Sequence, residues 1–189
     1  NDYAIGHSLT DGSELWRVGD LNPKNNYNRT LRFVASPVAT PSLVVIPSAK
    51  NGPVVALKPD AKASVDADSK QQQWRRSNNT PDVPSPLVHE GLVYLCRENG
   101  ILICIEADTG KELYQERTHS QRHRASPVYA DGKIYLTARD GTVSVVKAGR
   151  KFELLATNKL QDQTSASLAI SGGRIYIRGF DALYAIEKK

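Results

Sequence analysis

Arginine side chains are the residues of this sequence best suited to chemistry at a binding site. Guanidinium groups bind carboxylates and phosphates through paired hydrogen bonds, which lysine cannot reproduce. Arg122 and Arg124 flank His123 in one short polar segment, and further arginines recur between the apolar stretches of the chain. The candidate anion-binding set, called the basic mouth below, comprises Arg32, Arg97, Arg122, His123, Arg124, Arg139 and Arg178. Such a set binds anions, and we assign no catalytic residue.

The histidines do not form a recognisable metal-binding or catalytic pattern. His119 and His123 are four positions apart, but the segment between them, Ser120-Gln121-Arg122, is polar and carries a cation. A neighbouring cation disfavours a metal ion, and the sequence lacks the helical pattern that this spacing needs. The chain also contains no Gly-x-Ser-x-Gly, no phosphate-binding glycine loop and no Cys-x-x-Cys. We therefore predict no metal site and favour a function without catalysis.

The two cysteines allow at most one disulfide. Cys96 and Cys104 stand in apolar runs on either side of Asn99-Gly100. A two-residue turn there would place Cys96 opposite Ile103. It would also place Cys104 opposite Leu95, so the two sulfurs would point to opposite faces of the hairpin. We expect two buried thiols that pack as small apolar side chains. Such thiols do not indicate whether the protein works in an oxidising or a reducing compartment.

A repeated phrase organises the chain and positions these residues. Its copies contain Ser85, Ser126 and Ser167, which are spaced 41 residues apart, and each copy is followed by a glycine turn and a tyrosine. An earlier copy contains Ser36, which lies 49 residues before Ser85. The eight additional residues fall in the polar stretch 60–70, which we interpret as a loop insertion.

Each unit reads as four short strands, A to D, joined by turns in which glycine follows Asn or Asp, as in Asp140-Gly141. Such turns need positive φ. Four-stranded units of about 40–45 residues are typical of β-propeller blades, whereas a sandwich of meanders, the alternative, does not repeat in sequence. We therefore predict an all-β propeller of about four four-stranded antiparallel blades, as an incomplete or half ring. The single domain 1–189 is expected to contain blades at 33–77, 83–117 and 124–158, and partial blades at 1–18 and 165–189.

The repeated phrases resemble the PQQ-like β-propeller repeat. Ser-Pro-Val at 126–128 and Asp-Gly-Lys-Ile-Tyr at 131–135 match its first half, and Leu-Tyr-Ala-Ile-Glu at 183–187 matches a later strand. Thr-Gly-Lys-Glu-Leu-Tyr at 109–114 and Asp-Gly-Ser-Glu-Leu-Trp at 11–16 complete the pattern. The resemblance covers nearly the whole chain and implies the fold, but this repeat serves many unrelated functions. In the family an aromatic residue of strand D docks one blade onto the next. The matching positions here are Trp16, Trp74, Tyr114 and Leu155.

The resemblance implies two functional groups. Quinoprotein dehydrogenases of the family bind the quinone PQQ and calcium, and typically carry two adjacent cysteines. This chain has no adjacent cysteines, and no calcium-ligand set can be aligned. The BamB-like members are lipoproteins that hold protein partners in the outer-membrane assembly machinery. The resemblance thus favours a cofactor-free scaffold in the periplasm or another extracytoplasmic compartment. A dehydrogenase fragment and an extracytoplasmic sensor domain stay as alternatives.

Sorting the charges by face places the arginines at one end of the predicted central channel. The D–A and B–C connections open on one face, where thirteen Lys and Arg residues accompany six Asp and Glu residues. The opposite face carries nine Lys and Arg residues and eleven Asp and Glu residues. Beyond the basic mouth, the cations of the first face are Lys24, Arg29, Lys50, Arg75, Arg76, Arg117 and Lys159. A concave mouth ringed by arginines focuses positive potential and suits carboxylates or phosphates. Solvated loop charges without a function are the alternative.

The overall composition narrows the partners further. The 189 residues are 40% hydrophobic and 24% charged, as in a soluble globular protein. The net charge of +5 is too mild to indicate nucleic acid, and no apolar run is long enough for a membrane helix. We expect a protein or peptide partner, or an anionic small molecule, and a homodimer that completes an eight-bladed ring. Because the sequence contains no methionine, we expect it to be part of a longer chain.

Overall fold

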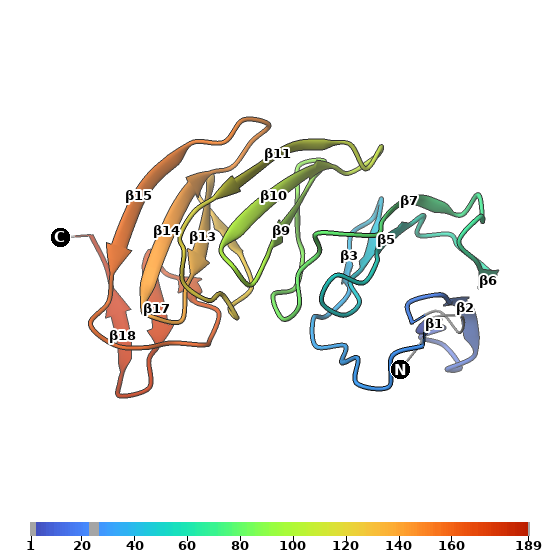
Figure 1. The fold of residues 1–189 in the computed structure, drawn as a ribbon, viewed down its shortest axis with the longest axis horizontal. Helices are drawn as coiled ribbons and strands as arrows, with labels where there is room; N and C mark the ends of the chain where they lie inside the picture. The colour runs from blue at the N-terminus through green and yellow to red at the C-terminus, as the bar shows by residue number, and fades with distance from the viewer. Residues whose placement is uncertain (1–2, 23–26, 189) are drawn as a thin grey trace.

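The computed structural model describes residues 3–22 and 27–188, and it consists of β-strands joined by turns (Figure 1). Five sheets lie side by side along an open arc, with β7, β11 and β15 on its outer rim. The described residues contain no helix that is long and apolar enough to cross a membrane. The all-β fold with four-stranded antiparallel sheets confirms the predicted propeller architecture in its incomplete form. Residues 1–2 of the first predicted blade and Lys24 lie outside the described residues.

Three sheets have the four antiparallel strands of a complete blade. The second sheet contains β3 (Val38–Ala39), β4 (Val44–Ile46), β5 (Val54–Leu57) and β7 (Gln72–Arg76). The third contains β8 (Leu87–His89), β9 (Leu92–Cys96), β10 (Ile101–Glu106) and β11 (Glu112–Arg117). The fourth contains β12 (Val128–Ala130), β13 (Lys133–Thr137), β14 (Thr142–Lys147) and β15 (Leu154–Lys159).

The first and fifth sheets have three strands each. The first contains β1 (Ala4–His7), β2 (Glu14–Val18) and β6 (Ala63–Val65), and the fifth contains β16 (Ala169–Ser171), β17 (Arg174–Arg178) and β18 (Leu183–Ile186). Strand β6 corrects the interpretation of 60–70 as a plain loop. It pairs in parallel with β2, so that Val65 lies beside Val18. Both valines are fully buried in the cluster between the first two sheets, which explains why this polar stretch contains a strand.

The hydrophobic core lies between neighbouring sheets, with one cluster at each junction. Strand β10 shows how one strand serves two junctions. Ile103 and Ile105 pack toward the second sheet, whereas Leu102 and Cys104 pack toward the fourth. Successive side chains of a strand point to opposite faces, so a central strand of a blade must be apolar on both. This accounts for the continuous apolar run in the sequence.

The predicted register around the cysteines is wrong by one residue. Cys96 pairs with Leu102, because the connection is a three-residue loop closed by a hydrogen bond from the Arg97 N–H to the Ile101 carbonyl (2.8 Å). Gly100 adopts φ of 79°, as such a bulged loop requires. A shift of one residue moves a side chain to the other face. Cys96 and Cys104 therefore lie on the same face, in one cluster.

Both cysteines are nevertheless free and buried, as predicted. Burial raises the pKa of Cys96 to about 12 and that of Cys104 to about 11. The thiols stay protonated at neutral pH, and protonated thiols are poor nucleophiles and metal ligands. These residues therefore act as small apolar side chains of the core.

The repeated serines form a hydrogen-bond ladder that runs from blade to blade. The Ser36 N–H donates to Ser85 Oγ (2.9 Å), Ser85 N–H to Ser126 Oγ (3.0 Å), and Ser126 N–H to Ser167 Oγ (2.9 Å). Each hydroxyl thus satisfies a backbone donor of the preceding blade. The serine of the repeated phrase is therefore explained by the fold, and it fixes the spacing of the segments that lead into strand A.

Replacing Ser126 with alanine should lower the free energy of unfolding by about 1–2 kcal/mol, because the Ser85 N–H loses its acceptor. Urea denaturation followed by circular dichroism measures this change. Ser171→Ala is the matched control, since Ser171 is exposed on β16 and its hydroxyl has no hydrogen-bond partner among the described residues. Equal stability of the two variants would show that the ladder contributes nothing.

Aromatic residues of the outer strands contact the next blade. The Trp74 Nε1–H donates to the Ala107 carbonyl of the third sheet (2.6 Å), and Tyr114 meets Phe152 edge to face at 5.7 Å between ring centroids. Trp16 packs at the edge of the cluster between the first two sheets. Leu155, at the fourth position, is 43% exposed.

Candidate anion-binding loop face

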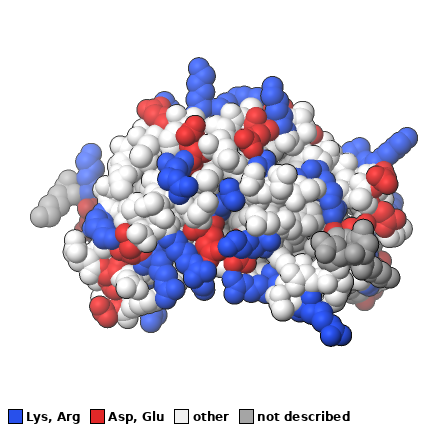
Figure 2. Space-filling model, in the orientation of Figure 1, with Lys and Arg blue, Asp and Glu red and all other residues white. Residues whose placement is uncertain are grey.

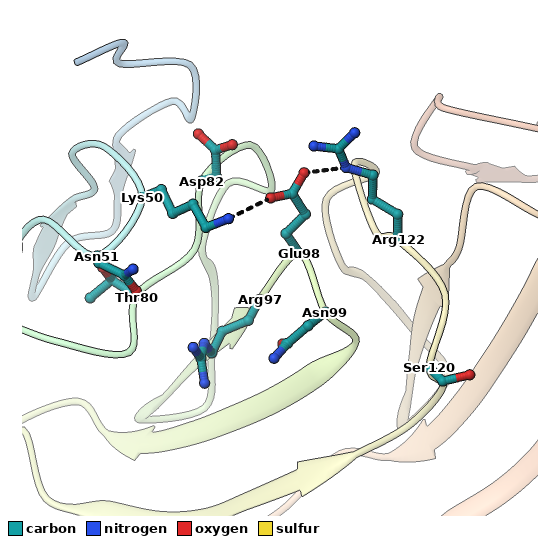
Figure 3. A pocket seen from close by; sticks show the side chains of 9 residues that line it. All are labelled: Lys50, Asn51, Thr80, Asp82, Arg97, Glu98, Asn99, Ser120 and Arg122. Carbon is teal, nitrogen blue, oxygen red and sulfur yellow. Dashed lines mark hydrogen bonds and ion pairs between the residues drawn. The ribbon is translucent and has the colours of Figure 1, made fainter. Parts of the chain in front are cut away.

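B–C turns and D–A loops meet on one face of the arc and line a solvent-open cavity of about 290 Å³. Two of the contributing segments are the turn between β4 and β5 and the turn between β9 and β10; two are the loops that precede β8 and β12. The lining residues are Lys50, Asn51, Thr80, Asp82, Arg97, Glu98, Asn99, Ser120 and Arg122 (Figure 3). The structure thus brings together two residues of the basic mouth that lie 25 positions apart in the sequence.

Backbone hydrogen bonds hold these loops in place. The His123 N–H donates to the Glu98 carbonyl (2.8 Å), and the Arg139 N–H donates to the Arg122 carbonyl (2.7 Å). The same arrangement recurs one blade later, where the Thr164 N–H donates to the Arg139 carbonyl (3.1 Å). The D–A loop before β12 is therefore fixed between the B–C turns of two neighbouring blades, and the loop before β16 is bonded to the turn of the fourth sheet. This repeated bonding gives the loop face a defined shape.

Glu98 connects two cations from different loops. Its carboxylate accepts from Lys50 Nζ (3.4 Å) and from Arg122 Nε. The Glu98 side chain is 11% exposed, whereas those of Lys50 and Arg122 are 60% and 47% exposed. Figure 3 shows the three side chains in a row, with Glu98 in the middle and Arg97 pointing away from it. The charge of Arg122 is thus partly compensated within the protein.

Arg32 is also compensated, by Asp82. Arg32 Nη2 lies 2.6 Å from a carboxylate oxygen of Asp82, whose side chain is 4% exposed. This hydrogen bond raises the pKa of Arg32. Asp82 stands three residues before Ser85, at the repeat position that His123 and Thr164 occupy in the next two blades. All three side chains are buried, so this position faces inward in these three blades.

His123 consequently lies beneath the surface. It is fully buried, and its Nδ1 lies 2.9 Å from the Gln121 carbonyl oxygen. Burial lowers its pKa, so the ring is neutral at neutral pH. Its Nε2 has no hydrogen-bond partner among the described residues. Although the sequence placed His123 in the basic mouth, we leave it out of the binding set proposed below.

Four arginines of the basic mouth have no carboxylate partner among residues 3–22 and 27–188: Arg97, Arg124, Arg139 and Arg178. Arg139 stacks over Phe180, with its guanidinium carbon 5.9 Å from the ring centroid. Arg178 Nε donates only to the Gly179 carbonyl (3.1 Å), and Arg124 Nε is buried without a hydrogen-bond partner in that part of the chain. Figure 2 shows Lys and Arg side chains gathered along the lower edge of the arc, with fewer acidic atoms between them.

The Asp140 carboxylate compensates the positive charge of Lys159, another cation of this face. Burial alone would raise its pKa, but hydrogen bonds from Lys159, Thr142 and His119 lower the pKa far below the usual range. Lys159 Nζ lies 2.6 Å from the Asp140 carboxylate, and His119 Nε2 lies 3.3 Å from it. Asp140 is therefore an anion at all ordinary pH values, and it compensates Lys159.

Sequence reasoning missed several residues that shape the cavity. Glu98 and Asp82 were counted among the charges of this face, but not as partners of particular arginines. The lining residues Asn51, Thr80, Asn99 and Ser120 carry no charge, and polar loop residues are common enough to give no indication by themselves. Aligning the repeats at the serine would have placed Asp82 and His123 at one inward-facing position.

The described residues do not fit the calcium ion that the dehydrogenase resemblance implies. Within them, no group of three or more His, Cys, Asp or Glu side chains is arranged to hold a metal ion. Three acids of the loop face are engaged by cations: Asp82, Glu98 and Asp140. A fourth, Asp162, accepts from the N–H groups of Phe180 and Asp181 (3.2 and 3.1 Å).

Comparisons with known proteins agree with the fold. A family model described as "Outer membrane protein assembly factor BamB" matches residues 60–151. No curated protein sequence matches the chain. The structure of BamB from Moraxella catarrhalis has a TM-score of 0.70 and 16% identity, and the match covers 97% of this chain and 51% of that one. The chain therefore spans about half the length of that BamB structure.

Two further structures show the same fold. The computationally designed Ika4 protein has a TM-score of 0.70 and 16% identity, with 93% of this chain and 98% of that chain covered. A europium-containing methanol dehydrogenase has a TM-score of 0.55 and 16% identity, with 68% and 25% covered. At this identity each likeness concerns the fold alone. The repeated blade sequence, the family model that matches residues 60–151 and the shared fold together support the resemblance to the PQQ-like β-propeller repeat family.

Proposed function

We propose that the chain is a non-enzymatic propeller scaffold that docks an acidic protein or peptide segment on its loop face. The observation that carries this proposal is the set of four guanidinium groups, on Arg97, Arg124, Arg139 and Arg178, that have no carboxylate partner among the described residues. Other cations of the same face, such as Arg32 and Lys159, are paired. An arginine without an internal partner is available to a carboxylate from outside.

The spacing of these arginines favours a polypeptide over a small anion. Arg97 lies in the turn after β9 of the third sheet, Arg139 lies in the turn after β13 of the fourth, and Arg178 ends β17 of the fifth. Because these arginines lie on three different blades, an extended acidic segment that crosses the blades can contact several of them. Acidic residues interspersed on the face, including Glu98 and Asp140, disfavour a stiff polyanion such as duplex nucleic acid, whereas a flexible acidic peptide can bend around them. The resemblance to BamB-like proteins supports an extracytoplasmic location.

The proposal is tested by the binding of fluorescein-labelled poly-L-glutamate, measured by fluorescence anisotropy. Charge reversal in the double variant R139E/R178E should weaken binding about tenfold or more, because two attractive groups become repulsive. The matched control is K62E/K70E, which changes the net charge equally on the opposite face with exposed lysines. Circular dichroism verifies folding of both variants.

An equal loss of affinity in the two double variants would contradict the proposal, since binding would then follow net charge alone. Absence of saturable binding to the unaltered protein at low salt would contradict it as well. Binding that weakens only in R139E/R178E locates the partner on the loop face.

A second copy of the chain is the partner that we propose for completing the ring. The chain spans half of the BamB structure, and the first and fifth sheets have three strands each. Two copies would supply eight of the serine-containing repeats. The homodimer stays a prediction. Sedimentation velocity should show a dimer, and a monomer alone would contradict the prediction.

A further inference from the structure

We propose that the cavity lined by Lys50, Arg97 and Arg122, called the Arg97 cavity below, is a subsite for one carboxylate of a docked polypeptide, with Arg97 as its anchor. This inference rests on the proposed function, because it names the group that the loop face takes from its partner. Arg97 differs from the other two cations in having no hydrogen bond or ion pair from its guanidinium to any described residue.

The surroundings of Arg97 favour this role. Its backbone N–H is held by the Ile101 carbonyl at the end of β9, and the preceding residue, Cys96, is fully buried. The backbone is therefore fixed, and only the side chain can move. Figure 3 shows the guanidinium pointing away from Glu98, which is engaged by Lys50 and Arg122. A positioned and unpaired guanidinium beside a cavity is suited to a carboxylate, which it binds through two parallel hydrogen bonds.

The charge of the cavity limits the ligand to a single negative charge. Three cations and two acids line it, which leaves an excess of one positive charge. Asp82 and Glu98 are only 4% and 11% exposed, so they are poorly screened by water. Arg32 engages Asp82, and Lys50 and Arg122 engage Glu98, so Arg97 is the one lining cation without a carboxylate partner among the described residues. A monocarboxylate matches the single charge of Arg97, whereas a phosphate dianion would leave one negative charge unmatched beside two acids.

The uncharged lining residues indicate that the carboxylate belongs to a peptide. The side-chain amides of Asn51 and Asn99 and the hydroxyl of Ser120 have no hydrogen-bond partner among residues 3–22 and 27–188. Amides and hydroxyls both donate and accept, so they can pair with the N–H and C=O groups of a peptide backbone. The volume of about 290 Å³ lies at the small end of ligand pockets. It therefore suits one acidic residue of a longer segment.

Nuclear magnetic resonance of the arginine Nε–H groups tests the subsite directly, with small probes at constant ionic strength. N-acetylglutamate α-amide carries a side-chain carboxylate, N-acetylglutamine carries a terminal one, and inorganic phosphate is the competing anion. We expect a saturable shift of the Arg97 signal with at least one of the two carboxylates. The one that binds more tightly identifies the source, and phosphate should bind more weakly than that carboxylate.

Arg97→Lys should weaken carboxylate binding about tenfold, since lysine keeps the charge but loses the paired geometry. Arg29→Lys is the control, because Arg29 is exposed and does not line the cavity. Tighter binding of phosphate than of either carboxylate would overturn the proposal, as would an unchanged affinity in Arg97→Lys.

The failure of this subsite is distinguishable from failure of the proposed function. If poly-L-glutamate binding depends on Arg139 and Arg178 but no probe shifts the Arg97 signal, the subsite is wrong while the docking function stands. If the probes shift the Arg97 signal but poly-L-glutamate does not bind, the docking function is wrong while the subsite stands.

Discussion

Replacing Trp74 with alanine should lower the free energy of unfolding by about 3–5 kcal/mol, the largest loss that we expect from one side-chain truncation. Trp74 is 9% exposed and lies in the cluster that joins the second and third sheets. Its Nε1–H donates to the Ala107 carbonyl across the junction (2.6 Å). The variant therefore loses apolar contact and leaves a carbonyl of the third sheet without its donor.

The surroundings of Trp74 make relaxation into the space difficult. Gly110 faces the indole so closely that a Cβ there would lie 2.6 Å from Trp74 Cβ. This glycine also has φ of 73°, which fixes the turn between β10 and β11. Because the turn is rigid and already in contact, it cannot move inward to fill the space of a lost indole. A cavity that does not collapse costs more than the transfer of the removed atoms.

Urea denaturation followed by circular dichroism measures the effect, since removing a tryptophan alters the fluorescence itself. Trp74→Phe keeps most of the apolar contact and should cost only about 1–2 kcal/mol from the lost hydrogen bond. In Trp74→Ala, unfolding should also separate into two transitions, because stability in repeat proteins depends on the interface between neighbouring units. A loss below that of Trp74→Phe would show that Trp74 does not couple the two blades.

The strands and their order were predictable because the same phrase occurs four times. Repetition turns a weak pattern into a strong one, so the copies at Ser85 and Ser126 each support the assignment of the other. The serine ladder shows why the spacing is kept: each hydroxyl must reach the backbone of the preceding blade. The insertion at 60–70 has no second copy in the chain. Its strand β6, stabilised by burial of Val65 against another sheet, was therefore not predicted.

The register of the β9–β10 hairpin could not be predicted from its turn residues alone. Asn99-Gly100 fits a two-residue turn, but it also fits the last two positions of a three-residue loop that starts at Glu98. Both give glycine the positive φ it needs, and they differ by one residue in register. The choice depends on tertiary bonds, including the one from the His123 N–H to the Glu98 carbonyl.

The face of each loop charge followed from the blade topology, but its partners did not. Because the B–C and D–A connections of a blade open on the same face, Lys50, Glu98 and Arg122 were expected there together. This pattern does not indicate that Glu98 contacts both cations. Ion pairs between loops depend on side-chain lengths and on the angle between blades. The basic mouth therefore stays a prediction, and the sequence pattern overestimated its free charge, because Arg32 and Arg122 are engaged by carboxylates.

Gly100→Ala should lower the free energy of unfolding by about 3 kcal/mol or more, and it should disrupt the Arg97 cavity. A Cβ at Gly100 would overlap the His119 carbonyl oxygen and approach His123 Cε1 to 3.0 Å. The first of these is a backbone atom, so the D–A loop itself must move. Forcing such a shift costs about 1–3 kcal/mol. The left-handed conformation of residue 100 adds about 1–2 kcal/mol for any residue with a Cβ.

Gly91→Ala separates these two contributions. Gly91 has a similar φ of 72°, but a Cβ there meets no atom within 4 Å. It should therefore cost only the conformational part, about 1–2 kcal/mol, and leave the cavity intact. Urea denaturation of both variants measures the difference. Equal losses would show that the D–A loop yields freely, and a rigid loop face would then be an incorrect description.

The same pair of variants connects stability to binding. His119 is followed by Ser120 and Arg122, which line the Arg97 cavity, so a displaced His119 carbonyl moves that wall. We expect Gly100→Ala to abolish the shift of the Arg97 Nε–H signal with N-acetylglutamate α-amide under conditions where the variant is folded, and Gly91→Ala to preserve it. If Gly100→Ala binds normally, the carboxylate does not depend on the position of the D–A loop. Arg97 would then have to bind it without the cavity wall that the loop supplies.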